Sequence, residues 1–348
     1  MVELWFAIAS AMLVTYIVLD GFDFGAGALH LLVAKTDQER RQVLGAIGPF
    51  WDANEVWLLA TGGVLFLAFP SVLASGLSGF YFAIFLVLWM LLLRGIAIEF
   101  RSHLEHPLWR SACDGVFGIA SAVLPVLFGA ALGNLVRGLP LDADGWFSLA
   151  LFTDFTARTP VGILDWYTVS AGVFALAALA GHGATFLVWK TDGPVRERSH
   201  RAATMLYGAT AVLWLPLTAA TALVNAPMLA ALPHRPLAVL FLLLAVGGLV
   251  MVGAGLRGHR DRRAFLGSCA FLTGMLTATA ACVFPAMLHS ITNDAWSLTA
   301  YNASVPVESL RIARRWGAIG LPLVLLYFYV LFRLHRGKVS VARAGEGY

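Results

Sequence analysis

Charged residues are scarce in this chain of 348 residues. Asp, Glu, Lys and Arg make up 13% of the sequence, whereas soluble domains carry about a quarter. Hydrophobic residues make up 59%, and the mean hydropathy is +0.78. A soluble globular chain does not have this balance, so the composition indicates an integral membrane protein.

Signatures of several other protein classes are missing. The three cysteines, Cys113, Cys269 and Cys282, form no CxxC pair, which indicates buried thiols rather than a disulfide framework or metal site. The N-terminal MVELWFAIAS lacks the basic stretch of a secretory signal, so we expect the first apolar segment to be retained. There is no phosphate-binding loop, GxSxG or HExxH motif. A net charge of +4 without a basic, aromatic-rich patch indicates no nucleic-acid partner.

Long apolar runs are abundant, and several exceed the roughly 18 residues that a helix needs to cross a bilayer. They lack the strict alternation of membrane β-strands. We therefore expect residues 1–348 to form one all-α integral membrane domain with about nine transmembrane helices. The expected helices cover 3–33, 52–72, 75–98, 113–136, 165–189, 202–224, 237–257, 265–289 and 315–333.

A short internal similarity suggests how these helices are grouped. LVAKTD at 32–37 and LVWKTD at 187–192 each close an expected helix and precede Arg-rich sequence. The repeat favours two four-helix bundles, 1–136 and 165–289, followed by a peripheral ninth helix at 315–333. A chance match of six residues is the alternative.

Basic residues fall unevenly on the two sides of the expected bundle. The positive-inside rule then places the N-terminus outside and the C-terminus in the cytoplasm. The cytoplasmic set is Lys35, Arg40, Arg41, Arg101, Arg110, Lys190, Arg196, Arg198, Arg201, Arg257, Arg260, Arg262, Arg263, Arg333, Arg336, Lys338 and Arg343. The smaller outer set is Arg137, Arg158, Arg235, Arg311, Arg314 and Arg315.

Two aspartates lie inside the first expected span, in the stretch LDGFDFGAG. The spacing of three places Asp20 and Asp23 on one helix face. A charged Asp at a helix centre costs about 2.5–3.5 kcal/mol, so such groups usually face a bundle interior or water. Gly21 and Gly25 form a GxxxG pair that lets another helix approach closely. Proton handling or ion binding is the functional interpretation, and hydrogen bonding between helices is the alternative.

Two further acids begin the second expected span, in GPFWDANEVW. Pro49 marks a helix start, and the helix dipole favours acids in a first turn, so Asp52 and Glu55 could be simple caps. A short loop makes the first two helices antiparallel neighbours. Asp52 would then lie near the cytoplasmic surface and Asp23 deeper, forming a graded acidic path of the kind that proton relays use.

Arg94 lies about one turn inside the third expected span. Snorkelling to the lipid head groups is its simplest role. Pairing with Glu99, or with one of the acids above, is the functional alternative.

Three histidines raise the question of haem ligation. His30 and His182 lie toward the cytoplasmic ends of their expected helices, whereas His289 lies at an outer end. A bis-histidine haem needs imidazoles at matched depth. We therefore expect these side chains to form hydrogen bonds between helices rather than to ligate haem.

These stretches together resemble subunit II of the cytochrome bd-type quinol oxidases, a group that includes the cyanide-insensitive oxidases. The matching segments occur in the family's order along both halves of the chain. They are LDGFDFGAG (19–27), IGPFWDANEVWLLATGGVLFLAFP (47–70), GFYFAIFLVL (79–88), LRGIAIEFRS (93–102), LGNL (132–135), FPAML (284–288) and SLTAYNAS (297–304).

The resemblance implies a complex in a bacterial cytoplasmic membrane that oxidises quinol on the outer side. It implies reduction of dioxygen to water with protons taken from the cytoplasm. Haem b and haem d are implied in a partner, subunit I, whereas subunit II stabilises that partner and lines a proton route. Asp52 matches the proposed entrance of the route, and Asp23 matches the second aspartate of the DGFD motif. Some family members also hold a structural quinone in subunit II, or bind small accessory subunits.

Two other functions fit parts of the sequence. A proton- or cation-coupled secondary transporter would suit many helices, a repeat and membrane acids, although no paired helix interruption occurs in both halves. A dihaem membrane cytochrome is the second alternative, and the absorption spectrum of the isolated chain would reveal it.

Overall fold

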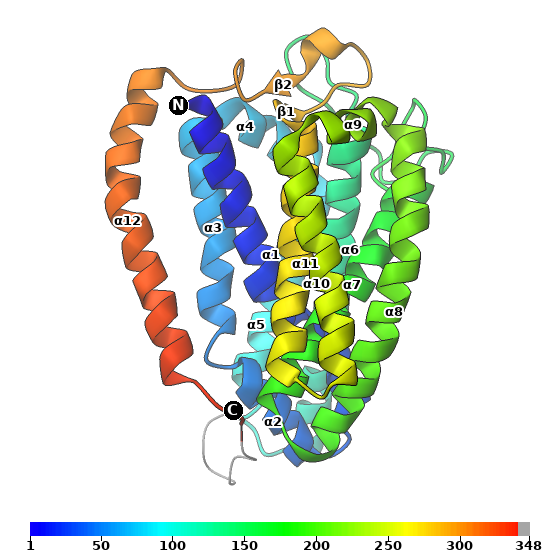
Figure 1. Ribbon diagram of the computed structural model, residues 1–348, viewed down its shortest axis with the longest axis vertical. Helices are drawn as coiled ribbons and strands as arrows, with labels where there is room; N and C mark the ends of the chain where they lie inside the picture. Colours follow the sequence, from blue (N-terminus) through cyan, green and yellow to red (C-terminus); the bar gives the residue numbers. More distant parts are fainter. Residues whose placement is uncertain (340–348) are drawn as a thin grey trace.

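The structure is a computed structural model that describes residues 1–339. The fold is a bundle of long helices that run between two ends of the molecule, with short helices and loops at both ends (Figure 1). The long helices are α1 (Val2–Val33), α3 (Trp51–Ala68), α5 (Tyr81–Phe100), α6 (Pro107–Arg137), α7 (Trp166–Lys190), α8 (Gly193–Val224), α10 (Pro236–Arg257), α11 (Asp261–Val283) and α12 (Val307–Leu334). The short elements are α2 (Asp37–Ile47), α4 (Pro70–Gly79), α9 (Ala226–Ala231), two 3₁₀ turns (Leu232–His234 and Asp294–Trp296), β1 (Ala286–Leu288) and β2 (Leu298–Thr299).

Each of the nine expected spans overlaps one long helix, so the all-α membrane fold is confirmed. Eight of these helices are long and apolar enough to cross a bilayer. The ninth, α3, has 18 residues and carries Asp52, Asn54 and Glu55 in its first turns, which lowers its hydropathy. The described residues therefore contain the expected helices, and three polar residues near the start of α3 set it apart from the eight.

The expected boundaries of the second and third spans were wrong. The range 52–72 runs through Pro70, but α3 ends at Ala68 and Pro70 begins the separate helix α4. Proline lacks an N–H donor and is favoured in a first helical turn, so it starts a new helix here. The third span begins at Tyr81 rather than at 75, because α4 occupies the intervening residues.

Two later boundaries also differ from expectation. Helix α11 ends at Val283 instead of 289, because Pro285 and strand β1 follow it directly. Helix α12 begins at Val307 instead of 315, so the basic stretch RIARRW lies within the helix and not before it. Hydropathy placed the start of α12 too late, because the arginines near the start of the helix lower the local hydropathy to a value typical of loops.

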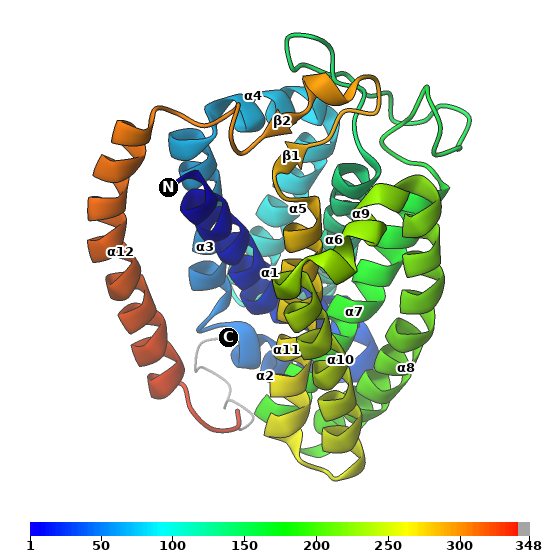
Figure 2. The same cartoon turned by 45° about the horizontal axis from the view of Figure 1, so that its top comes forward.

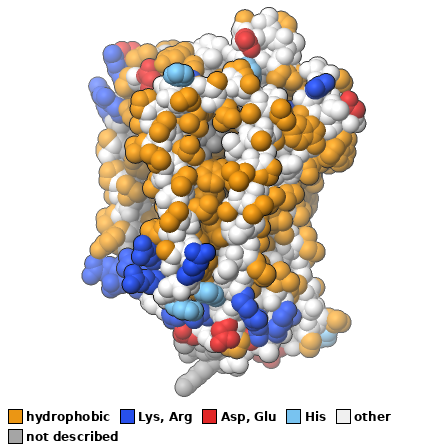
Figure 3. Space-filling view, turned by 45° about the vertical axis from the view of Figure 1, so that its right-hand side comes forward, with side chains coloured by type: hydrophobic (Ala, Val, Ile, Leu, Met, Phe, Trp, Pro, Cys, Tyr) orange, Lys and Arg blue, Asp and Glu red, His pale blue; other side chains and the backbone are white. Residues whose placement is uncertain are grey.

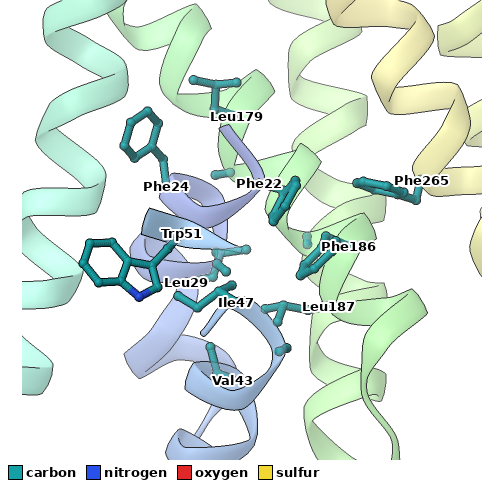
Figure 4. Close-up of a cluster of buried hydrophobic side chains, with 14 of the residues drawn as sticks. Phe22, Phe24, Leu29, Val43, Ile47, Trp51, Leu179, Phe186, Leu187 and Phe265 are labelled. Carbon is teal, nitrogen blue, oxygen red and sulfur yellow. The ribbon is translucent and has the colours of Figure 1, made fainter. Parts of the chain in front are cut away.

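The two halves of the chain meet where α1 crosses α7. A Cβ atom built on Gly183 of α7 would lie 2.3 Å from the backbone nitrogen of Ala26 on α1, and one built on Gly25 would lie 2.0 Å from the carbonyl oxygen of Leu179. The crossing therefore requires glycine on both helices. Beside it, the buried rings of Phe22 and Phe186 stack with centroids 4.0 Å apart (Figure 4).

Loops and small elements cover one end of the bundle. Strands β1 and β2 pair antiparallel there, and the segment between α6 and α7 lies beside them (Figure 2). The N-terminus of α1 lies at this end, whereas α2 lies at the other (Figure 1).

Helix α12 stands at the side of the bundle in both views (Figures 1 and 2). Only Leu310, Ala313 and Phe328 of its described side chains are buried. Phe328 packs on Trp57 of α3 with ring centroids 5.5 Å apart. Past the helix, the backbone N–H of Val339 donates to the carbonyl of Lys190 at the α2 end of the molecule. The described chain thus starts and ends at opposite ends of the bundle, and the tail residue Arg343 lies outside the described residues.

Candidate functional site

Three helices place ionisable side chains together inside the bundle. Arg94 of α5 donates one hydrogen bond to Asp20 of α1 at 2.7 Å and another to Glu55 of α3 at 2.5 Å. The side chains of Asp20 and Arg94 are fully buried, and that of Glu55 is 27% exposed. One guanidinium therefore connects an acid in the interior to an acid that reaches the surface.

Snorkelling of Arg94 was the wrong expectation. Its side chain does not reach the head groups but lies within the bundle, over the ring of Phe24 at 4.5 Å from the ring centroid. Carboxylates on two neighbouring helices supply partners in the interior, which removes the reason to snorkel. Its ion pairs are with Asp20 and Glu55, while Glu99 lies at the exposed end of α5.

Asp23 lies one helical turn beyond Asp20 and is equally buried. Its Oδ2 accepts a hydrogen bond from the Asn54 side chain at 2.8 Å. The same amide group donates to the backbone carbonyl of Leu19 at 3.2 Å. Asn54 thus binds α3 to α1 and places a neutral donor, not a cation, beside the second aspartate.

Asp52 occupies the first turn of α3 and is exposed. It forms no ion pair or side-chain hydrogen bond with any residue from 1 to 339. Glu55 follows one turn later on the same side of the helix, since residues three apart share a face. The hydrogen-bonded series therefore runs from the partly exposed Glu55 through Arg94 to the buried Asp20, with the exposed Asp52 one turn before Glu55. The Asp23–Asn54 pair is also buried and lies one turn nearer the α2 end than Asp20.

Several polar atoms around this cluster have no hydrogen-bond partner within the described residues. More than nine in ten buried polar groups in proteins do have one, from protein or water. A cluster of such atoms at one site offers hydrogen-bonding groups to water or to a partner chain. The atoms are Asp20 Oδ2, Asp23 Oδ1, Asn54 Oδ1, Trp57 Nε1 and Arg94 Nε.

The histidines lie in separate places. In His182, Nδ1 is 2.7 Å from the Ser268 hydroxyl and Nε2 is 2.8 Å from the carbonyl of Val18, so both ring nitrogens bind neighbouring groups. His30 contacts Asp114 at 2.7 Å, at the α2 end of the bundle. His289 follows β1 at the opposite end. These positions bring no two imidazoles together.

Sequence reasoning missed two buried polar residues. Asn54 lies between Asp52 and Glu55 in the sequence but on another side of the helix turn. A polar residue on that second side could have indicated a polar contact with a neighbouring helix. Asp114 was an acid inside an expected span and should have been noted for the same reason as Asp20. It accepts hydrogen bonds from Arg101 at 2.6 and 3.0 Å and from Arg40 at 3.0 Å.

Comparison with known proteins identifies the family of this chain. The family model for cytochrome bd terminal oxidase subunit II matches residues 1–335. The chain is 32% identical to cytochrome bd ubiquinol oxidase subunit 2 of Bacillus subtilis (strain 168), over 95% of each chain. It is 30% identical to cytochrome bd-I ubiquinol oxidase subunit 2 of Escherichia coli (strain K12), over 93% of this chain and 91% of that one.

A solved structure has the same fold. The bd oxidase from Geobacillus thermodenitrificans matches with a TM-score of 0.73 at 18% identity, and the match covers 96% of this chain and 98% of that chain. A secondary transporter is not favoured by these matches. The chain therefore belongs to the cytochrome bd terminal oxidase subunit II family and is the second subunit of a bacterial, membrane-bound quinol oxidase.

Proposed function

We propose that this chain conducts protons from the cytoplasm toward the oxygen-reducing site of subunit I. In this proposal Asp52 receives protons at the surface, Glu55 passes them inward, and the buried Asp20 and Asp23 hold them. Arg94 and Asn54 position the acids. The observation that carries the proposal is the ion-paired series Glu55–Arg94–Asp20, which begins at a partly exposed carboxylate and ends at a fully buried one.

The charges of the cluster support proton occupancy. Asp20 and Glu55 share the guanidinium of Arg94, and Asp23 is a third carboxyl group one turn from Asp20. An uncompensated buried charge is costly, so a carboxyl that carries a proton fits the inner position better than a third anion. Asp23 receives only a neutral amide donor, which makes it the group best suited to hold that proton.

Orientation follows from the basic residues. We place the N-terminus outside and the C-terminus in the cytoplasm, because the arginine-rich turns lie at the α2 end. Asp52 then faces the compartment from which protons are drawn. Thiol labelling of intact cells tests this: an impermeant reagent should modify Asp144→Cys and leave Glu197→Cys unmodified. The reverse pattern would contradict the orientation.

The redox groups of the complex belong to the partner in this proposal. We assign haem b and haem d to subunit I, quinol oxidation to the outer side, and dioxygen reduction to the partner's haem site. His182 is not assigned to haem, since it uses both ring nitrogens in hydrogen bonds. A structural quinone or accessory subunits would add to this assembly without changing the proton route.

The decisive experiment replaces the outermost acid. Asp52→Asn keeps the size of the side chain and removes its exchangeable proton, so oxygen consumption by the purified complex should fall about tenfold or more. The haem spectrum should stay unchanged, and Asp52→Glu should restore turnover.

Glu197→Gln is the matched control, because Glu197 is an exposed acid at the same end of the molecule. It should leave turnover unchanged. Full turnover in Asp52→Asn would mean that Asp52 only caps α3.

A further inference from the structure

The turn between α10 and α11 concentrates positive charge. Arg257, Arg260, Arg262 and Arg263 fall within seven residues, and all four side chains are exposed. None of the four forms a side-chain ion pair or hydrogen bond within residues 1–339. A basic turn at a membrane boundary can serve as an orientation signal, but that role requires charge alone and no shaped site.

The single acid of this turn is already neutralised. Both oxygens of Asp261 accept hydrogen bonds from the Arg196 guanidinium of α8, at 2.8 and 2.9 Å. Lys338 also approaches Asp261 at 3.8 Å. The positive charge of the neighbouring arginines is therefore left without a balancing anion.

A shallow hollow of about 500 Å³, largely open to solvent, lies at these arginines. Its lining combines a polar end with apolar side chains of the two transmembrane helices. The lining residues are Met251, Arg260, Asp261, Arg262, Arg263 and Leu266. Leu266 is 47% exposed, so an apolar surface continues from the basic end along the helices.

The hairpin that presents this hollow is tightly packed. A Cβ atom built on Gly255 would lie 2.5 Å from the backbone nitrogen of Ala264, and one built on Gly267 would lie 2.7 Å from that of Val252. Direct backbone contact between α10 and α11 fixes the spacing of the two helix ends that carry the arginines. The backbone of the hairpin is therefore in place before a ligand binds, and only the arginine side chains need to be ordered.

We propose that the α10–α11 turn binds an anionic phospholipid. The phosphate of the head group pairs with Arg260, Arg262 and Arg263, and an acyl chain follows Met251 and Leu266 along the bundle. Basic groups gather toward one end of an otherwise apolar surface on this side of the molecule (Figure 3). Arginine suits this ligand because its fork of N–H donors matches phosphate oxygens, and basic pockets at transmembrane helix ends bind acidic head groups.

The test compares two double variants of the intact complex. Arg262→Gln with Arg263→Gln removes two charges from the proposed site. Arg314→Gln with Arg315→Gln is the matched control, because those adjacent arginines are also exposed and lie in an early turn of another membrane helix, α12. Delipidated complex in neutral detergent is titrated with phosphatidylglycerol or phosphatidylcholine, and bound lipid is counted by native mass spectrometry.

The wild-type complex and the α12 variant should bind phosphatidylglycerol more tightly than phosphatidylcholine. The α11 variant should bind phosphatidylglycerol about 25-fold more weakly, since each arginine near a membrane surface contributes about fivefold. Arg262→Lys with Arg263→Lys should keep most of the binding, and all variants should retain the wild-type haem spectrum.

Three outcomes would overturn the proposal. Equal binding of the two lipids by the wild type would show that the site does not select an anion. Equal losses in both double variants would place binding elsewhere. Displacement of the lipid by inorganic phosphate at the same concentration would show that the site takes a free anion, with no contribution from the acyl chain.

Discussion

Arg94 binds Asp20 at 2.7 Å with both side chains shielded from solvent, and its other nitrogen holds Glu55. This guanidinium joins α1, α3 and α5. Replacing Arg94 alone would leave Asp20 as an unpaired acid in the membrane interior. Replacing Arg94 and Asp20 together by neutral residues would remove both fully buried charges.

Arg94→Gln should therefore lower the stability of the complex by about 3–5 kcal/mol, the usual effect of breaking a buried pair. Arg94→Gln combined with Asp20→Asn should recover a large part of that loss. The temperature at which purified complex loses its haem spectrum measures both effects. Additive losses in the double variant would show that the two residues are not coupled.

Asp23→Asn should slow oxygen consumption without disturbing assembly. The new amide can turn its carbonyl oxygen toward Asn54 and keep the 2.8 Å hydrogen bond, but it cannot carry a proton. Turnover should fall severalfold while the amount of complex in the membrane stays normal. Normal turnover together with normal assembly would reduce Asp23 to a packing residue.

Gly183→Ala should destabilise the contact between the two halves of the chain. The added methyl group would lie 2.3 Å from backbone atoms of α1, and overpacking of this kind costs about 1–3 kcal/mol. The yield and melting temperature of the complex measure the effect. Gly208→Ala on α8 is the control, because a Cβ atom there meets nothing within 4 Å. Equal behaviour of the two variants would argue against a close crossing of α1 and α7.

Acid should weaken the attachment of α2. The Arg198 guanidinium, together with the backbone N–H groups of Lys35 and Thr36, lowers the pKa of Glu39 to about 2 from its usual 4.5. A lowered carboxyl pKa stabilises the fold above about pH 4.5, and this contribution is lost as the pH falls toward 2.

Glu39→Gln should thus lower the free energy of unfolding by about 1 kcal/mol or less at pH 7, because the pair is partly exposed. The difference from wild type should shrink in melts recorded from pH 5 down to pH 3. Glu197→Gln, which removes a nearby exposed acid, should show no such trend. A difference that stays constant with pH would contradict the role of the Glu39–Arg198 pair.

The amino-acid sequence determined the number and place of the long helices. Hydropathy adds along a run of residues, so each span is a local property that needs no knowledge of its neighbours. The same local argument marked Asp20, Asp23, Asp52 and Glu55 as costly in a membrane. It failed at Pro70 and Pro285, where a proline ended or started an element inside an apolar run.

Only the tertiary structure decided which of those groups meet. The pairing of Arg94 with Asp20 and Glu55, and of Asn54 with Asp23, depends on how α1, α3 and α5 are rotated against one another. Helix rotation is set by side-chain packing across residues far apart in sequence, such as Gly25 against Gly183. The spacing of charges along one helix carries no information about the face that its neighbour presents. For that reason the sequence alone favoured a snorkelling Arg94, although its side chain is paired inside the bundle.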